Sequence, residues 1–370
     1  MKKIEDLSDL NKKKILLRLD LNVPLKDSKI IDTTRIDKIL PTLKYLIEKK
    51  SQLIIISHIG RPKGRIDLKL SMLPVCEHLS AKLKIEVKLI NKRIFDINPK
   101  LFTENNTNKI FFLENIRFYE QEERNDEEFA RKLSSFGEIF VNDAFSCSHR
   151  KHASVDKITK FLPSYCGIQM NAEVNALKKV TTDIKKPIAC IIGGSKISTK
   201  ISVIKNLIPK FENIIIVGAM ANNIIKYKGF SIGNSIIENN CNSIVEEIFL
   251  LAKKNKCKII FPKDVAVGKK LNDKAKIKDL SNIEDDDLIL DIGPKTISLI
   301  KSILENSKTV LWNGPAGYFE NSNFAIGSEE IAKKIVSLGN KIYSVAGGGD
   351  TIAVINKINA FKKLDFVSTA

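Results

Sequence analysis

Short apolar runs alternate with segments of helical periodicity along the whole chain, and this alternation limits the possible folds more than any other feature. In the first half, the runs that predict buried strands are residues 14–19, 53–57, 110–113 and 139–142. Helical patterns lie between them, for example at residues 36–49 and 126–134. Strands that alternate with helices are typical of parallel sheets with right-handed crossover connections.

The second half of the chain repeats this scheme. Its predicted strands are residues 188–192, 214–217, 258–261, 288–291, 310–312 and 342–345. A helix over residues 171–182 precedes them, and Pro187 opens the first of these strands. We therefore predict an α/β protein with two doubly wound parallel-sheet (Rossmann-like) domains, residues 1–170 and 171–370, joined by a hinge helix. Each domain is expected to bind its ligand at the carboxyl ends of its strands.

The composition is typical of a soluble globular protein. A length of 370 residues suggests about two domains, and contents of 43% hydrophobic and 28% charged residues are ordinary. The sequence has no apolar run of about 18 residues, and its N-terminus is acidic where a signal peptide would be apolar. The six cysteines are scattered without C-x-x-C spacing, which indicates reduced thiols. We expect a cytoplasmic protein that does not contact membranes.

The formal net charge of +18 leaves two interpretations open. A strongly basic chain can bind nucleic acid. Alternatively, the lysines are spread over solvated faces of a lysine-rich protein. We favour the second interpretation, because the lysines do not alternate with aromatic residues and no nucleic-acid-binding motif is present. The positive field would still attract small anionic substrates, and we expect a monomer that binds such substrates and no nucleic acid.

Arginine and glycine are distributed unequally along the chain. Every arginine lies in the first 150 residues, whereas most of the 18 glycines lie after residue 170. An arginine side chain offers a planar fork to a carboxylate or phosphate. Glycine lets backbone N–H groups close around a polyphosphate at the start of a helix. The distribution therefore predicts a small-anion site in the first half and a nucleotide site in the second.

In the first domain, a basic residue lies at the end of each of four predicted strands. The polar residues of these segments are Arg18, Asp20 and Asn22, then His58 and Arg61, then Arg117, and finally His149, Arg150 and His152. Because ligand sites of α/β domains lie beyond the strand ends, we predict one pocket for a small anion. Three other interpretations remain: a half-exposed strand end at residues 18–22, a structural role for His58, and a weakly supported metal site at the last two histidines.

In the second domain, glycine-rich loops follow several predicted strands. Residues 193–200 (GGSKISTK) open a helix, and they match neither the Walker A motif nor the dinucleotide fingerprint. Residues 347–351 (GGGDT) also open a helix, where Asp350 could cap the helix or hold Mg²⁺. Residues 312–315 (WNGP) end a third strand, with Glu320 shortly beyond. Any one of these loops occurs in many α/β proteins, but together they predict a nucleotide site.

The residue types also indicate the kind of chemistry. A nucleotide phosphate or a substrate carboxylate is already ionised at neutral pH, so a transfer between them needs no dedicated base. Catalysis would then consist of positioning and charge neutralisation. The sequence agrees with this expectation, because it is rich in arginine, lysine and glycine loops and shows no clear nucleophile–base pair.

Several of these segments, in this order, resemble those of the phosphoglycerate kinase family over essentially residues 1–369. The matching segments are LRLDLNVPL, SHIGRPKG, LENIRFYEQEERND, VNDAFSCSHRKHAS, GGSKISTK, VGAMAN, DIGPKT, LWNGPAGYFE and AGGGDT. The resemblance implies a kinase of glycolysis and gluconeogenesis that moves a phosphoryl group between 1,3-bisphosphoglycerate and ADP, giving 3-phosphoglycerate and MgATP. It also implies that the domains close on a hinge and exclude water.

The resemblance further implies a role for individual residues. The phosphoglycerate would be held by Asp20, Asn22, Arg35, His58, Arg61, Arg117 and Arg150. Charge on the transferring group would be neutralised by Arg35, Lys196 and Lys200. The nucleotide would be bound by Gly194, Lys200, Gly218, Gly293, Asn313 and Glu320, and by Gly348, Gly349, Asp350 and Thr351. Of these residues, Asp350 would bind Mg²⁺.

The sequence departs from the family pattern at its C-terminus. The family continues after Ser-Thr with Gly-Gly-Gly-Ala, which opens a last helix and leads to a tail on the first domain. This chain ends at Ser368, Thr369 and Ala370. The difference gives a second hypothesis, that of a C-terminally truncated homologue that binds nucleotide and is catalytically impaired.

Overall fold

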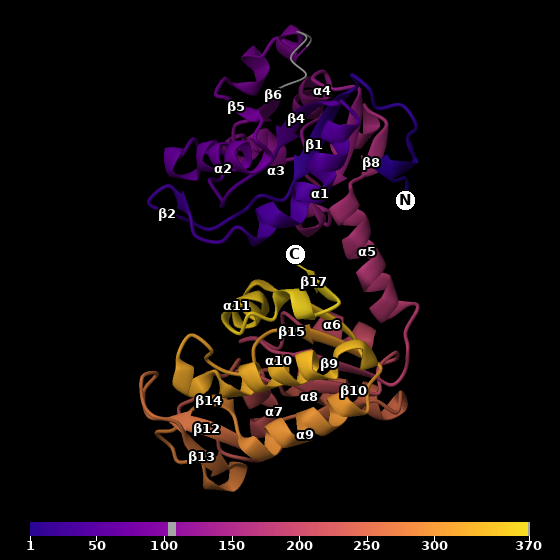
Figure 1. Cartoon of the computed structure of the whole chain (residues 1–370). Helices are drawn as coiled ribbons and strands as arrows, with labels where there is room; N and C mark the ends of the chain where they lie inside the picture. The colour runs from indigo at the N-terminus through magenta and orange to yellow at the C-terminus, as the bar shows by residue number, and fades with distance from the viewer. Residues whose placement is uncertain (103–108, 369–370) are drawn as a thin grey trace. The chain divides into compact units, whose positions relative to one another are not determined.

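The computed structural model describes residues 1–102 and 109–368, and backbone contacts divide the chain into the units Met1–Asn175 and Ala176–Ala370. Figure 1 shows the path of the chain through the helices and strands of each unit. The division falls inside helix α5 (Ile168–Thr181), as does the predicted boundary after residue 170. The departure from the family pattern that the sequence shows at Thr369 and Ala370 lies outside the described residues.

The first unit is built on one six-stranded parallel sheet. In spatial order its strands are β5 (Glu86–Ile90), β6 (Lys109–Leu113), β4 (Gln52–Ile56), β1 (Lys14–Leu19), β7 (Ile139–Asp143) and β8 (Ser164–Cys166). Every neighbouring pair is parallel. The apolar run 14–19 matches β1 at both ends, because a strand buried on both faces has a continuous apolar sequence.

Alternate residues of these strands pack into two separate cores. Leu17 of β1 lies in a core with helices α1 (Thr34–Glu48) and α2 (Leu73–Leu83). Its neighbour Leu16 lies in a second core with helix α4 (Glu127–Ser134). Since successive side chains of a strand point to opposite faces, the helices cover both faces of the sheet. The first unit is therefore doubly wound, as predicted.

The second unit repeats this architecture. Its six-stranded parallel sheet has the order β11 (Lys258–Ile260), β10 (Asn213–Ile216), β9 (Ile188–Ile192), β15 (Thr309–Asn313), β16 (Tyr343–Gly347) and β17 (Phe366–Ser368). One face packs against α6 (Ile201–Leu207), α7 (Ala221–Tyr227) and α8 (Asn242–Lys254). The other packs against α9 (Pro294–Glu305), α10 (Ile326–Leu338) and α11 (Gly349–Lys357). The predicted fold class is thus confirmed for both units.

One predicted strand belongs to a different sheet. Residues 288–291 form β14 (Leu288–Ile292), which pairs antiparallel with β12 (Asp264–Gly268), and β12 pairs antiparallel with β13 (Lys276–Asp279). The expectation that this strand joins the parallel sheet was wrong. Strand β13 (KIKD) is too polar to be recognised, and a separate small core that includes Val265 and Val267 supports this second sheet. Pairing direction depends on such partners and not on the strand's own sequence.

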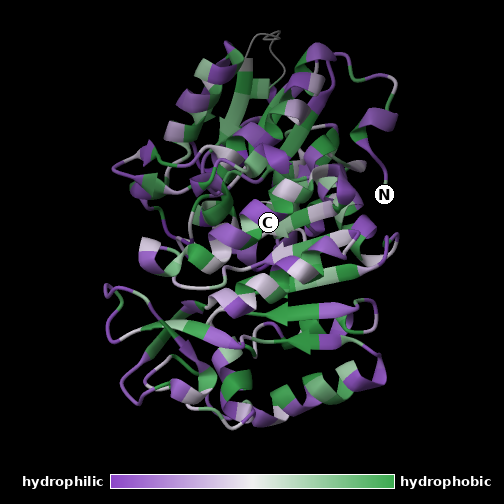
Figure 2. Ribbon diagram, turned by 60° about the horizontal axis from the view of Figure 1, so that its bottom comes forward, coloured by the Kyte–Doolittle hydropathy of each residue, from purple (hydrophilic) through white to green (hydrophobic). Residues whose placement is uncertain are grey.

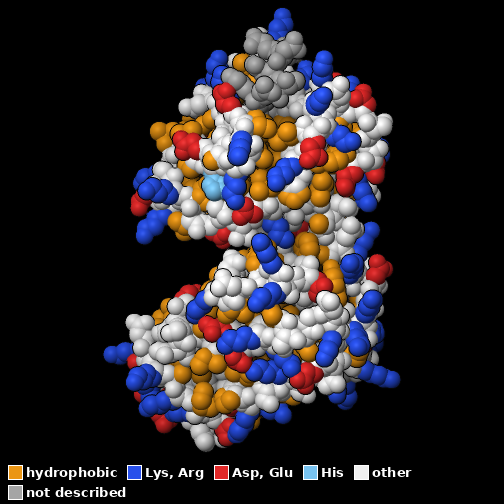
Figure 3. All heavy atoms as spheres, in the orientation of Figure 1, with side chains coloured by type: hydrophobic (Ala, Val, Ile, Leu, Met, Phe, Trp, Pro, Cys, Tyr) orange, Lys and Arg blue, Asp and Glu red, His pale blue; other side chains and the backbone are white. Residues whose placement is uncertain are grey.

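Hydropathy follows this architecture. Figure 2 shows the hydrophobic residues gathered on the strands inside each unit, with hydrophilic residues mainly on the outer helices and loops. On the face drawn in Figure 3, lysine and arginine side chains are dispersed over both units with acidic residues between them. Among the described residues, no helix is both long and apolar enough to span a membrane.

Candidate active site

The carboxyl ends of four neighbouring strands bring the predicted anion-binding residues of the first unit together. Strands β6, β4, β1 and β7 are adjacent and parallel, so the loops after them leave the same edge of the sheet. The loop after β6 carries Arg117, and the loop after β4 carries His58 and Arg61. The loop after β1 carries Asp20 and Asn22, and the loop after β7 carries Arg150. Arg35 joins them from the first turn of α1. The topology therefore supplies one site from four loops and a helix.

Hydrogen bonds hold the acidic and amide residues of this site in place. The Asp20 carboxylate accepts hydrogen bonds from the Arg35 guanidinium and, at 2.6 Å, from the Ser146 hydroxyl. The Asn22 side-chain oxygen accepts from the backbone N–H of Gly60 at 2.8 Å. These bonds connect the loop after β1 to α1 and to the loops after β4 and β7. Asp20 therefore orients the guanidinium of Arg35, which is half-buried.

Two arginines of the site have a buried Nε donor left over. Arg117 is 3% exposed and donates to the Gly60 carbonyl at 2.9 Å, while its Nε lies 3.7 Å from Glu123. Burial lowers the pKa of Arg117. The buried Nε atoms of Arg117 and Arg150 have no hydrogen-bond partner. Because an unmade hydrogen bond at a buried charged group is costly, these donors fit a site that receives an anion. Arg61 is exposed.

The electrostatic field at His58 also indicates that the arginines of this site lie close together. Burial, followed by the positive charges of Arg18, Arg117, Arg35 and Arg150, holds the pKa of His58 well below its usual range. Four guanidinium groups thus act on one buried imidazole. Such a field favours a multiply charged anion in the pocket, and it keeps the histidine neutral at physiological pH.

The alternative interpretation of a metal site at His149 and His152 gains no support. His149 is exposed, whereas His152 is buried with its Nδ1 atom 3.8 Å from a carboxylate oxygen of Glu122. Burial, together with Arg117, lowers the pKa of His152 to about 4. A neutral, buried histidine on the inner side of the arginine cluster fits a structural role better than metal ligation.

In the second unit, a cavity of about 340 Å³ opens beside the glycine loops. Much of its wall is apolar, with contributions from Ala219, Ile236, Leu271, Leu290, Pro315 and Phe319. Ile236 and Leu271 are 68% and 46% exposed, so their apolar surface is accessible to a ligand. An apolar slot with few polar groups is typical of a pocket for a flat aromatic ring such as a nucleobase.

Glycine is required where the loops after β9 and β15 meet. A Cβ atom on Gly193 would lie 2.1 Å from the carbonyl oxygen of Pro315, and one on Gly314 would lie 2.3 Å from the carbonyl oxygen of Gly193. Gly193 also donates its N–H to the carbonyl of Asn313 at 2.8 Å. The two backbones therefore touch directly, which positions the predicted nucleotide loops against each other.

A chain of hydrogen bonds joins three of these loops. The Lys200 ammonium donates to the Asn313 side-chain oxygen at 2.9 Å, and the Asn313 amide donates to the Gly347 carbonyl at 3.0 Å. The N–H of Gly314 donates to the Thr351 hydroxyl at 2.7 Å. Lys200, Asn313 and Thr351 are thereby fixed at the start of α11, where N–H groups of the first turn are available to phosphate.

The predicted nucleotide residues differ in where they lie relative to the cavity. Gly194, Gly218, Glu320 and Asp350 are part of its lining. Others lie on the same loops beyond the lining, namely Lys196, Lys200, Asn313, Gly348, Gly349 and Thr351. Gly293 lies elsewhere, at the start of α9, where a Cβ atom would be 2.4 Å from the carboxylate of Asp264.

One polar residue of the cavity escaped the sequence analysis. Asp291 lines the cavity at 3% exposure, and its carboxylate accepts from the N–H groups of Gly327 and Ile292 at 2.7 and 2.8 Å. Burial raises the pKa of Asp291 to about 7. The sequence offered two signals, an acidic residue inside an apolar strand (LILDI) and its place at the start of the family-like segment DIGPKT, and neither alone assigns Asp291 a role.

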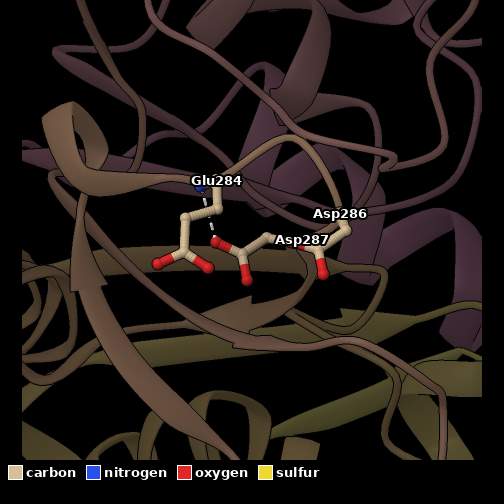
Figure 4. Close-up of side chains that lie close together, drawn as sticks. All are labelled: Glu284, Asp286 and Asp287. Atoms are coloured by element: carbon tan, nitrogen blue, oxygen red, sulfur yellow. Dashed lines mark hydrogen bonds between the residues drawn. The ribbon is translucent and has the colours of Figure 1, made fainter.

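A cluster of three carboxylates in the second unit has a different character. Figure 4 shows Glu284, Asp286 and Asp287 side by side. All three are paired with Lys269, and two of them also with Lys278. The two lysines offset most of the negative charge of the three carboxylates, so this cluster is a salt-bridge network of the small antiparallel sheet. Asp350, in contrast, is exposed beside the cavity.

Comparisons with known proteins agree with this geometry. A sequence model of the family described as phosphoglycerate kinase matches residues 4–370. A phosphoglycerate kinase of Wolbachia pipientis wMel is 44% identical over 365 residues, covering 98% of this chain and 92% of the relative. A cytosolic phosphoglycerate kinase of Triticum aestivum is 41% identical over 98% of this chain and 91% of its own length. The structure of phosphoglycerate kinase from Coxiella burnetii superposes with a TM-score of 0.87 at 34% identity, covering 99% of this chain and 93% of that structure.

Proposed function

The chain belongs to the phosphoglycerate kinase family, and from this premise we propose how its own residues perform the family reaction. That reaction transfers a phosphoryl group between 1,3-bisphosphoglycerate and ADP, yielding 3-phosphoglycerate and ATP. The observation that carries the assignment is the family match over residues 4–370. The relatives match over nearly their whole length, which argues against the second hypothesis of an impaired homologue.

The first unit holds the phosphoglycerate in this proposal. The substrate is contacted by side chains after four strands and at the start of α1, namely Asp20, Asn22, Arg35, His58, Arg61, Arg117 and Arg150. The unpartnered Nε atoms of Arg117 and Arg150 support this role, because a phosphate oxygen would satisfy them. The exposed Arg61 is free to move towards the substrate.

The second unit binds the nucleotide. The base occupies the apolar cavity, with Gly194 and Gly218 in its wall and Glu320 close to the ribose. The phosphates lie against Lys200 and Asn313 and against the N–H groups of residues 348–351 at the start of α11. Gly293 would act indirectly in this arrangement, because it lies at the start of α9 next to the cavity residue Ile292.

Mg²⁺ fits the chemistry of the same loop. The exposed Asp350 carboxylate lies beside the cavity near the proposed phosphate position, and hard oxygen donors from protein and nucleotide are what Mg²⁺ prefers. When bound, Mg²⁺ would neutralise part of the charge on the nucleotide phosphates. Arg35, Lys196 and Lys200 would stabilise the charge on the transferring group, and neither nucleophile needs a base because both are already ionised.

Several wider properties belong to the same proposal. The protein acts as a monomer on small molecules in the cytoplasm, and it binds neither nucleic acid nor membranes. A relative described as cytosolic supports the location. The dispersed lysines on the face of Figure 3 support a general positive field rather than a nucleic-acid surface. Light scattering of the purified chain and its binding to DNA at low and high salt would test these properties.

A coupled assay with 3-phosphoglycerate and MgATP tests the reaction itself. We expect turnover that depends on both substrates. A Lys200→Ala variant, prepared in parallel, should lose at least about 100-fold in kcat, which excludes a contaminating host enzyme. A folded wild-type chain that binds MgADP and shows no turnover above this variant would instead support the impaired homologue.

A further inference from the structure

Arg18 is a completely buried arginine at the end of β1, with 0% exposure. Among the described residues no carboxylate forms an ion pair with it, and its donors are used inside the protein. Its Nε donates to the Ser154 hydroxyl at 3.0 Å, and one Nη donates to the Leu19 carbonyl at 2.7 Å. The other Nη lies 3.1 Å from Nδ1 of His58. Arg18 therefore bridges the protein interior and a residue of the proposed anion site.

The charge of Arg18 is balanced through Ser154. Glu122, in the short helix α3 (Glu120–Glu123), is also completely buried, and its carboxylate accepts from the N–H and the hydroxyl of Ser154 at 2.9 and 2.6 Å. The serine hydroxyl has one hydrogen and gives it to Glu122, so its lone pair is available to accept from Arg18. Arg18 thus donates in two directions, to His58 on one side and to Ser154 on the other, and Ser154 donates in turn to Glu122.

The direction of these hydrogen bonds determines the tautomer of His58. A guanidinium group donates hydrogen bonds and cannot accept them. Nδ1 of His58 must therefore accept from Arg18, and the proton of the neutral imidazole must be on Nε2, on the other side of the ring. The opposite tautomer would place two N–H groups against each other at 3.1 Å.

The charges that act most strongly on His58 from the other elements are positive, and the Asp20 carboxylate of the same site is paired with Arg35. Arg35 faces it from α1, Arg117 from the loop after β6 and Arg150 from the loop after β7. Along this series of hydrogen bonds, the first negatively charged group is the Glu122 carboxylate, which is linked to His58 only through Arg18 and Ser154. His58 is itself 2% exposed. A second proton on the ring would thus meet four guanidinium groups in a buried environment.

We propose that Arg18 is a positioning residue, which, backed by Ser154 and Glu122, locks His58 as a neutral Nε2–H donor for a phosphate oxygen of the substrate. His58 then contributes a fixed hydrogen bond rather than a titrating positive charge. This inference rests on the proposed function for the nature of the anion, whereas the tautomer itself is a property of the unliganded chain. Arg18 need not touch the substrate to act in this way.

Nitrogen-15 NMR of the full-length wild-type chain tests the tautomer directly. Long-range ¹H–¹⁵N spectra between pH 5.5 and 8 should show His58 with a protonated Nε2, a bare Nδ1 and no titration. The His58→Gln variant identifies the signal by its loss. A His58 protonated on Nδ1, or one that titrates in this range, would overturn the proposal even if the enzyme is fully active.

Substitutions of His58 itself test the donor while Arg18 is retained. The amide of Gln can place an N–H near the position of Nε2, whereas the amide of Asn places it near that of Nδ1. In calorimetry, His58→Gln should bind 3-phosphoglycerate at least about fivefold more tightly than His58→Asn. The reverse order would contradict the proposal. Absence of binding to the wild-type chain would count against the proposed function, and the NMR result would still stand.

An Arg18→Met variant completes the test by removing the donors. If it folds, the His58 signals should show both tautomers, and KM for 3-phosphoglycerate should rise about tenfold while kcat changes less than threefold, as for a lost hydrogen bond to a charged group. Arg18→Lys should restore the Nε2–H tautomer. A folded Arg18→Met variant with an unchanged His58 spectrum would assign Arg18 a purely structural role. If the variant does not fold, the two preceding experiments decide.

Discussion

At the scale of single residues, two arginines of the first unit differ in what their guanidinium groups contact. Arg35 is held by the buried carboxylate of Asp20 within the proposed anion site. Arg131 is exposed, where it pairs with Glu127 at 3.3 Å and stacks on Phe161. Surface pairs of this kind contribute little to stability. The contrast makes Arg131 a matched control for Arg35.

We expect Arg35→Lys to lower kcat by about 100-fold, because lysine keeps the charge and loses the planar fork. Arg131→Lys should remain within about twofold of the wild type. Steady-state kinetics with both substrates at saturation would measure the difference. Equal effects of the two substitutions would contradict the role assigned to Arg35.

The buried His152 should make the fold sensitive to acid. Its pKa in the folded protein is lowered to about 4, whereas an unfolded histidine titrates near its usual value of 6.5. As the pH falls, His152 therefore takes up a proton in the unfolded chain before it does so in the folded protein. The contribution of neutral His152 to the free energy of unfolding is fully present above pH 6.5, and it is lost as the pH falls from 6.5 towards 4. His58 contributes in the same direction.

We therefore expect His152→Gln to lose less stability than the wild type between pH 7.5 and pH 5. Urea unfolding of the variant at both pH values would measure this slope. His149→Gln, at an exposed position three residues away, should retain the slope of the wild type. If all three proteins lose the same stability on acidification, His152 does not titrate as its burial requires.

At the scale of elements, the loops after β9 and β15 depend on glycine for their contact. A Cβ atom on Gly193 would collide with a backbone oxygen of Pro315, which cannot move as a side chain could. We expect Gly193→Ala to cost about 1–3 kcal/mol of stability, as other overpacking substitutions do, and to weaken nucleotide binding as well. Thermal unfolding with and without MgADP would measure both effects.

Gly349→Ala is the control for that prediction. Gly349 begins α11, and a Cβ atom there would lie within 4 Å of no described residue other than its chain neighbours and its own helix backbone. Since alanine also favours a helix over glycine, the melting temperature should be unchanged or slightly higher. A melting temperature lowered as much as in Gly193→Ala would show that the packing at Gly193 is not the cause.

The elements also show which parts of the fold the sequence predicts well. Strands β1 and β9 were predicted with correct ends, because both are buried along nearly their whole length and most of their residues are apolar. Strands β5 and β8 were missed, since β5 alternates exposed and buried residues and β8 has three residues at the edge of the sheet. Edge strands need fewer apolar residues, so their signal is weaker.

At the scale of the whole molecule, each unit is expected to respond to a different ligand. Phosphoglycerate should protect the loops after β1, β4, β6 and β7 of Met1–Asn175 from hydrogen exchange. MgADP should protect residues 193–200, 313–320 and 348–351 of the second unit. Binding suppresses local opening at the contact site, so each ligand added alone should slow exchange in its own unit.

Hydrogen-exchange mass spectrometry of the full-length chain would check this division. Helix α8 in the second unit, which supplies none of the proposed nucleotide contacts, provides peptides that should not respond to phosphoglycerate. Protection of the glycine loops by phosphoglycerate alone, with none in the first unit, would reject the assignment of substrates to the two units.

The sequence by itself determined the two doubly wound sheets and most candidate site residues. The physical reason is that a parallel sheet buried on both faces needs continuous apolar strands, and the polar loops after them meet at one edge. Only the tertiary structure decided contacts between distant segments. These include the bond from Arg18 to His58, the place of Asp291 in the cavity wall, and the antiparallel partner of β14. Such contacts depend on how the crossover connections bring strands side by side, which local periodicity does not encode.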